Sequence, residues 1–173
     1  PILGKSALNV ILMAGLVACI LVGLFMLLYY RLPGIIADIA LLFQIVTQVL
    51  VISGVGMSLT LAGIAGIILT IGMGVDANVI IYERIKEEIK SGKTIRAAID
   101  VGFERAFTAI FDGNITTLIT AVVLYMLGSG SIQSFAFTLG LGVLLNFITA
   151  IVISRTFLRA VSGFKITKNR WLY

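Results

Sequence analysis

The sequence contains no histidine, one cysteine, two prolines and few charges, and each scarcity excludes a class of protein. Without histidine, the commonest ligand of catalytic zinc and of haem is missing, and so are the Ser-His-Asp and Cys-His sets of hydrolases. Cys19 has no partner within the chain, which excludes an internal disulfide. We therefore expect no metal site, no cofactor and no enzymatic activity of these kinds.

Charged residues make up only 12% of the 173 residues, whereas hydrophobic residues make up 60%. Soluble domains carry about 25% charged residues, so this chain cannot cover a water-soluble surface. The composition predicts a membrane protein.

Five apolar stretches are each long enough to cross a bilayer as a helix. They are apolar at both odd and even positions, which favours helices over the alternating strands of a membrane barrel. Short turns containing glycine, proline or serine separate them. The sequence therefore predicts an all-α protein in which residues 1–173 form a single transmembrane domain, a five-helix bundle. The predicted spans are 8–30, 35–55, 59–82, 106–127 and 135–154.

One long polar interval, 83–105, connects the third and fourth spans. Its first part continues the third helix as far as Lys90. Its second part carries apolar residues at helical spacing, which predicts a separate short helix lying on the membrane surface, with a solvated linker helix as the alternative. These apolar residues are Ile95, Ala98, Ile99, Gly102 and Phe103.

The basic residues are distributed unevenly along the chain. With five spans, twelve of the thirteen Lys and Arg residues fall on one side and only Lys5 falls on the other. The positive-inside rule then places the N-terminus outside, and the connector 83–105 and the tail 155–173 in the cytoplasm. Anionic lipid accounts for the net charge of +5, so we expect a membrane-lipid partner and no nucleic acid.

Three carboxylates, Asp38, Asp76 and Asp112, lie inside predicted spans. Inserting a charged side chain into the middle of a membrane span costs about 2.5–3.5 kcal/mol, so a span retains one where the protein shields it or where it has a function. Because the third and fourth spans are antiparallel, Asp76 and Asp112 are expected at nearly the same depth, roughly 9 Å from the membrane edge. Asp76 is predicted to move protons or ions, with a purely structural role as the alternative. For Asp112 both roles stay open, and Asp38 is interpreted as structural.

Polar and small residues accompany these carboxylates. Asn78, Asn114, Thr116 and Thr117 are predicted to support the polar layer, and Gln44 and Gln48 to bond a neighbouring helix. Small residues on the third span predict close helix packing. The glycines assigned to this packing are Gly63, Gly66, Gly72 and Gly74.

These residues leave three hypotheses open. The first is a proton-coupled transport subunit, and the second is an intramembrane aspartyl protease that uses Asp76 and Asp112. The run Gly72 to Asp76 is comparable with the GxGD signature of such proteases, but Val75 intervenes and rotates the carboxylate by about 100°. The third is a structural scaffold, which would tolerate asparagine in place of Asp76.

Several motifs together resemble the SecD family of bacterial protein-export membrane proteins. The most specific string is VDANVIIYERIKEE at 75–88, and the sister protein SecF differs there. Further matches are YYRLPG at 29–34, IADIAL at 36–41, RAF at 105–107, DGNITTLI at 112–119, FAFTLG at 135–140, FITAI at 147–151 and Arg155. The family commonly has alanine at the position of Gly113 and a small residue at that of Asn146, and its outer hairpin carries a proline and a lysine that 128–134 lacks.

The resemblance implies half of an RND-type transporter membrane domain. It implies a subunit that uses the proton-motive force with SecF to assist export of preproteins by SecYEG and SecA, with YajC as a further partner, in the bacterial cytoplasmic membrane. Asp76 would take up and release protons at the interface with SecF. The sequence begins at Pro1 without a signal-peptide pattern, so we expect a piece of a longer protein. The resemblance implies that this piece holds spans two to six and lacks the family's first span and extracytoplasmic domain. The coupling ion, proton or sodium, is left open, as is another RND-type transporter.

Overall fold

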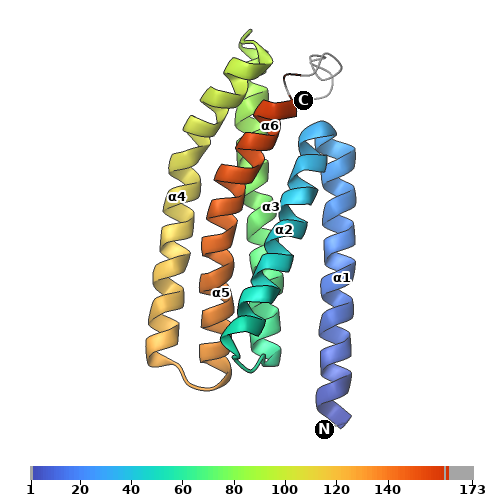
Figure 1. Cartoon of the computed structure of the whole chain (residues 1–173), viewed down its shortest axis with the longest axis vertical. Helices are drawn as coiled ribbons and strands as arrows, with labels where there is room; N and C mark the ends of the chain where they lie inside the picture. The colour runs from blue at the N-terminus through green and yellow to red at the C-terminus, as the bar shows by residue number, and fades with distance from the viewer. Residues whose placement is uncertain (1, 162, 164–173) are drawn as a thin grey trace.

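The computed structural model describes residues 2–161 and 163. The five long helices run in alternating directions and are joined by short turns (Figure 1). Five helices in the described part are long and apolar enough to cross a membrane. The elements are α1 (Ile2–Tyr30), α2 (Leu32–Val55), α3 (Leu61–Lys90), α4 (Ile95–Leu127), α5 (Ser131–Ile148), the π-helix η1 (Thr149–Ser154) and α6 (Arg155–Val161).

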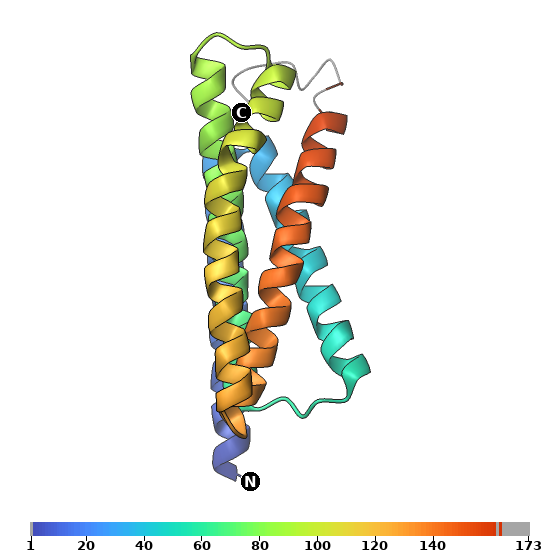
Figure 2. The same cartoon turned by 90° about the vertical axis from the view of Figure 1, so that its left-hand side faces the viewer.

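Helices α3, α4 and α5 pack closely on one another, and α4 and α1 lie at opposite edges of the bundle (Figure 1). Helix α2 is tilted, so its C-terminal end lies apart from α3, α4 and α5 (Figure 2). Most apolar side chains of α1 are exposed, including Val10, Leu16 and Leu28. Surfaces of this kind are stable against lipid or another apolar helix, and not against water.

A tight turn joins α1 to α2. Arg31 has a φ of 53°, and Pro33 follows within the first turn of α2. A Cβ atom added at Gly34 would lie 2.0 Å from the carbonyl oxygen of Met26. Only glycine therefore lets the two helices approach this closely.

Small residues form the seam between α3 and α5. The Cβ positions of Gly63, Gly66 and Gly142 would each come within 2.5 Å of a side-chain atom on the facing helix. The facing pairs are Gly63 with Ser134, Gly66 with Thr138 and Gly142 with Thr70. Backbones can approach closely where such residues face one another, which is the usual way for membrane helices to pack.

Two of the four predicted packing glycines lie in this seam, and a third, Gly74, faces Gln44 of α2 and Asn146 of α5. The fourth, Gly72, is exposed, and a Cβ atom there would meet nothing within 4 Å. The predicted packing role of Gly72 is therefore wrong for contacts within this chain. Gly72 and Gly74 are two residues apart and point to nearly opposite sides of the helix.

Two buried glutamines attach α2 to the seam. The Gln48 amide nitrogen donates to the Thr138 carbonyl at 3.0 Å, and its oxygen lies 3.3 Å from the Thr70 hydroxyl. The Gln44 amide nitrogen lies 3.5 Å from the Thr70 carbonyl. The interpretation that these glutamines bond neighbouring helices is confirmed. Each is at most 1% exposed, so these bonds are made away from lipid.

The segment after the third helix differs from the prediction. Residues 95–105 are the first three turns of α4, which continues without a break to Leu127. Their apolar face packs on α3: Ala98 and Ile99 are fully buried, and a Cβ at Gly102 would lie 2.9 Å from the backbone nitrogen of Ile85. The predicted separate surface helix is wrong, because α3 covers the stripe that a membrane surface would have covered.

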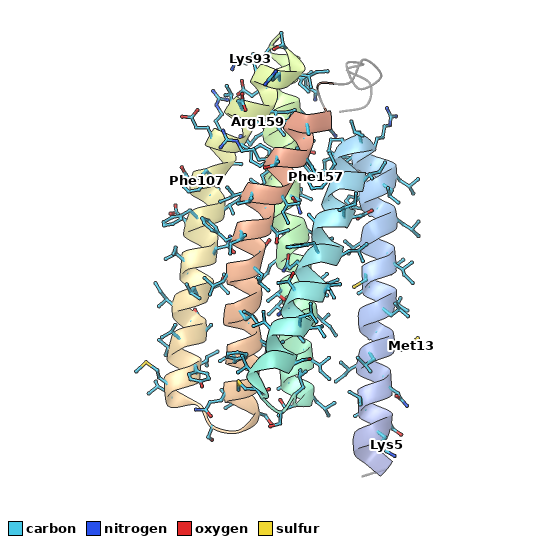
Figure 3. All side chains as sticks on the ribbon, in the orientation of Figure 1. Lys5, Met13, Lys93, Phe107, Phe157 and Arg159 are labelled. Atoms are coloured by element: carbon cyan, nitrogen blue, oxygen red, sulfur yellow. The ribbon has the colours of Figure 1, made fainter. Side chains whose placement is uncertain are left out.

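Ion pairs close the turn between α3 and α4. The Glu88 side chain is only 3% exposed and pairs with Lys93 and, at 2.5 Å, with Arg105. Farther along, Asp100 of α4 pairs with Arg159 of α6 at 2.5 Å. Lys93 and Arg159 lie at one end of the bundle and Lys5 at the other (Figure 3). The basic tail positions 165, 168 and 170 used in the orientation argument lie outside the described residues.

Candidate intramembrane site

A cavity of about 220 Å³ lies between α3 and α4, with α5 behind it, and opens on the bundle surface. Asp76 lies on its α3 side, and Asn114 and Thr117 lie on its α4 side. Apolar and small residues complete the walls, among them Met73, Ala77, Ile80, Ala109, Ile110 and Gly113. The cavity therefore combines one carboxylate with neutral donors and acceptors.

Asp76 is exposed within the apolar part of α3. Gly72, one turn earlier on α3, is exposed too and leaves open space beside it. A carboxylate at this depth is costly in lipid unless protein, water or a proton compensates its charge. The described part of this chain does not enclose Asp76.

The two predicted asparagines are buried beside this region. The Asn78 side-chain nitrogen donates to the Gly74 carbonyl at 3.1 Å, and that of Asn114 donates to the Ile110 carbonyl at 2.9 Å. Each bond is to the preceding turn of its own helix, and it holds the amide against the helix. Asn114 lines the cavity, whereas Asn78 is buried and does not line it.

The predicted threonines and Asp112 divide between two faces of α4. Thr117 lines the cavity, whereas Asp112 and Thr116 are exposed and do not. The Thr116 and Thr117 hydroxyls donate to the backbone carbonyls of Asp112 and Gly113 at 2.9 and 3.0 Å. Gly113 shares the cavity with Asp76, which places its neighbour Asp112 at a similar depth. The structure therefore groups Asp76 with Asn114 and Thr117 and leaves Asp112 and Thr116 to the side.

Sequence reasoning missed Asn146 as a site residue. Asn146 is 2% exposed and lines the cavity from α5. It follows Thr138 and Gly142 at four-residue spacing, on the face that packs against α3. The four-residue spacing can be seen in the sequence, but the sequence does not show that this face of α5 packs against α3.

Asp38 belongs to a separate cavity between α1 and α2, which it lines with Cys19 and Gly23. Its Oδ1 atom is buried and has no hydrogen-bond partner among the described residues. In the part of the chain that the structure describes, no group of three or more acidic or cysteine side chains is arranged to hold a metal ion.

These features define a helical, multi-pass membrane domain with a carboxylate-bearing cavity on its surface. The chain belongs to the family of protein-export membrane proteins described as SecD/SecF, C-terminal, whose sequence pattern matches residues 1–163. The predicted resemblance to SecD and the predicted five-helix fold are thereby confirmed.

Known relatives agree with this assignment. The protein translocase subunit SecD of Acidaminococcus fermentans is 52% identical over 98% of this chain, and the subunit SecDF of Bacillus subtilis is 48% identical over 98%. The crystal structure of SecDF, a translocon-associated membrane protein from Thermus thermophilus, superimposes with a TM-score of 0.90 and 37% identity over 94% of this chain. This chain spans 40%, 22% and 23% of these three proteins.

Proposed function

We propose that this chain is the membrane-embedded part of a bacterial Sec export subunit that uses the proton-motive force to assist preprotein translocation. Its partners would be SecF within the membrane, the SecYEG translocon, the SecA motor and YajC. Its relatives are named protein translocase subunits, which supports this role. The observation that carries the proposal is the exposed Asp76 carboxylate in an open cavity of a membrane-spanning helix.

Asp76 would act as the proton carrier. Docking of a SecF helix over the open side of the cavity would remove the carboxylate from lipid, and burial raises the free energy of its charged form. Protonation from one side and release to the other would then be linked to movement of the two subunits. One charge crossing the field provides about 2.3 kcal/mol per 100 mV. Asn114, Thr117 and Asn146 would supply hydrogen bonds to both forms, with Asn78, Asp112 and Thr116 in supporting positions.

The test compares two substitutions in the full-length subunit with its partners. Asp76→Asn is nearly isosteric but carries no proton, so we expect it to abolish the stimulation of preprotein export. Asp112→Asn is expected to impair export less, since Asp112 does not line the cavity. Both variants should insert and retain wild-type helicity. Wild-type export by Asp76→Asn would refute proton coupling and favour a structural scaffold.

Another RND-type proton-coupled transporter remains the first alternative, and an intramembrane aspartyl protease the second. In a protease, Asp76 and Asp112 would share a proton, so loss of either would be equally damaging. Of these two aspartates, Asp76 lines the cavity and Asp112 does not. Cleavage of a membrane-spanning test peptide by the purified protein, abolished by either substitution, would favour the protease.

A further inference from the structure

A second cavity, of about 230 Å³, lies where α3, α4 and η1 meet; it shares Ile110 with the first cavity, but Asp76 does not line it. We propose that this cavity binds a phospholipid through a phosphoethanolamine headgroup. Its polar lining residues are Arg155 and Glu104. Its apolar lining residues are Ile81, Phe103, Phe107, Ile110 and Ile151.

The cavity lies at the level where the apolar spans end. Ile81 precedes the polar extension of α3 by two residues, and Phe103 and Phe107 flank the start of the apolar part of α4. Arg155 is the first residue beyond the last apolar span. This is the depth at which lipid phosphates and the first carbons of acyl chains meet a membrane protein.

Both charges in the cavity are without an ionic partner among the described residues. The Nε atom of Arg155 is buried and makes no hydrogen bond to a described residue, and its guanidinium lies 5.9 Å from the centre of the Phe103 ring. Glu104 is exposed and forms no ion pair within the part of the chain that the structure describes. Nearby, Glu88 and Asp100 are both paired. Burial of an unpaired arginine donor is costly, so the cavity is suited to a ligand that supplies an acceptor.

The π-helix η1 contributes to this arrangement. It spans Thr149–Ser154, supplies Ile151 to the cavity wall, and ends directly before Arg155. Its wider turn changes the direction of the residues that follow, compared with a continuous α-helix. Single π-helical turns within α-helices are rare and are frequently found at functional sites.

The charges of the cavity match those of phosphoethanolamine. Its phosphate would accept hydrogen bonds from Arg155, whose planar donor group suits phosphate oxygens. Its ammonium group would donate to Glu104. The aromatic side chains of Phe107, Phe111 and Phe147, whose ring centres are 5.8–5.9 Å apart, would provide an apolar surface for an acyl chain below the headgroup. A choline headgroup offers no N–H donor, and a glycerol headgroup has no cation for Glu104.

The experiment measures lipid retained by the purified chain. The protein is equilibrated with equal amounts of phosphatidylethanolamine, phosphatidylcholine and phosphatidylglycerol, and retained lipids are counted by native mass spectrometry. We expect a preference for phosphatidylethanolamine. Arg155→Gln should reduce its retention about tenfold or more, since bonds to charged groups are involved. Glu104→Gln should abolish the preference over phosphatidylcholine.

Two surface substitutions at the same end of the bundle serve as matched controls. Lys90→Gln and Glu87→Gln remove one charge of each sign outside the cavity and should leave retention unchanged. Ile151→Phe retains both charges but narrows the cavity, so it should lower retention even if Arg155→Gln fails to fold. Equal retention by wild type and Ile151→Phe would overturn the proposal. A wild-type preference for phosphatidylglycerol, or no preference at all, would also overturn it.

Discussion

Asp76 and Glu88, two carboxylates on α3, occupy opposite environments. Asp76 is exposed within an apolar stretch and no described residue encloses it. Glu88, three turns farther along and beyond the apolar span, is buried between Lys93 and Arg105. The first arrangement leaves a charge that groups beyond the described residues must compensate. The second holds a carboxylate between two cations, which stabilises the turn.

Stability should therefore depend on Glu88 at acidic pH. The Lys93 hydrogen bond, and secondarily the Arg105 charge, lower the pKa of Glu88 from its ordinary value of about 4.3. Because the pKa of Glu88 is lower in the folded chain than in the unfolded chain, ionised Glu88 stabilises the fold at pH values above its unfolded pKa. This stabilisation is lost as the pH falls through the pKa of Glu88 in the folded chain. We expect the melting temperature, followed by circular dichroism in detergent, to decrease below about pH 4.3.

The matched variants are Glu88→Gln and Glu87→Gln. Glu88→Gln should be less stable than wild type at neutral pH, and the difference should shrink in acid. Glu87→Gln removes an exposed pair with Arg84 and should follow the wild-type profile. If wild type and Glu88→Gln keep a constant difference at all pH values, the ionised Glu88 does not stabilise the turn.

At the scale of the element, α4 serves two environments with one continuous helix. Its first three turns pack closely on α3 through Gly102, and its middle presents Gly113 to open space. Ala98 and Ala106 are fully buried on the α3 side of the same segment. Residues 95–105 carry charged side chains, yet they belong to a packed helix, because Gly102 lets the apolar face of this segment lie close to α3.

Alanine at the two glycines of α4 should therefore have opposite effects. Gly102→Ala would place a Cβ 2.9 Å from the Ile85 nitrogen and 3.0 Å from its Cα, where backbone cannot yield, and should cost about 1–3 kcal/mol. Gly113→Ala meets nothing within 4 Å and should add up to about 1 kcal/mol through helix propensity. Unfolding of both variants in mixed micelles by increasing SDS measures the two effects. Similar effects from both would contradict the inferred packing of α3 on α4.

At the scale of the molecule, the chain has a packed centre and a face left open around Asp76. A bulky group on that face should disturb assembly without disturbing the fold. Gly72→Leu is expected to leave the helicity and melting temperature of this chain unchanged, and to reduce co-purification of the full-length subunit with SecF. Gly54→Leu, at an equally open glycine on α2, is the matched control. Normal co-purification of Gly72→Leu would place the partner on another face.

The orientation of the whole bundle gives a further prediction. Ser129 lies exposed in the turn after α4, and Ser91 lies exposed at the opposite end of that helix. In a Cys19→Ser background, a cysteine at position 129 should react with an impermeant thiol reagent from outside the cell. A cysteine at position 91 should react only after the membrane is opened. The reverse labelling would contradict the positive-inside assignment.

The sequence by itself determined the helices and much of the packing chemistry. In lipid every backbone polar group must be bonded within its segment, so a run of 20 apolar residues permits little besides a helix. Glycine permits close approach of two helices, so the small residues on α3 could be predicted to lie in a helix contact. Gln44 and Gln48 could be assigned to helix contacts because a buried amide needs a partner.

The tertiary structure alone decided which face of each helix meets which neighbour. The stripe Ala98–Phe103 has the same spacing whether a membrane or α3 covers it, and Gly72 resembles Gly74 in the sequence. Asp76, Asn114 and Asn146 reach one cavity from three helices, as Ile81, Glu104 and Arg155 reach another. A local pattern carries periodicity and polarity, but the rotation of a helix about its axis is set by long-range contacts, and those rotations place the side chains of both cavities.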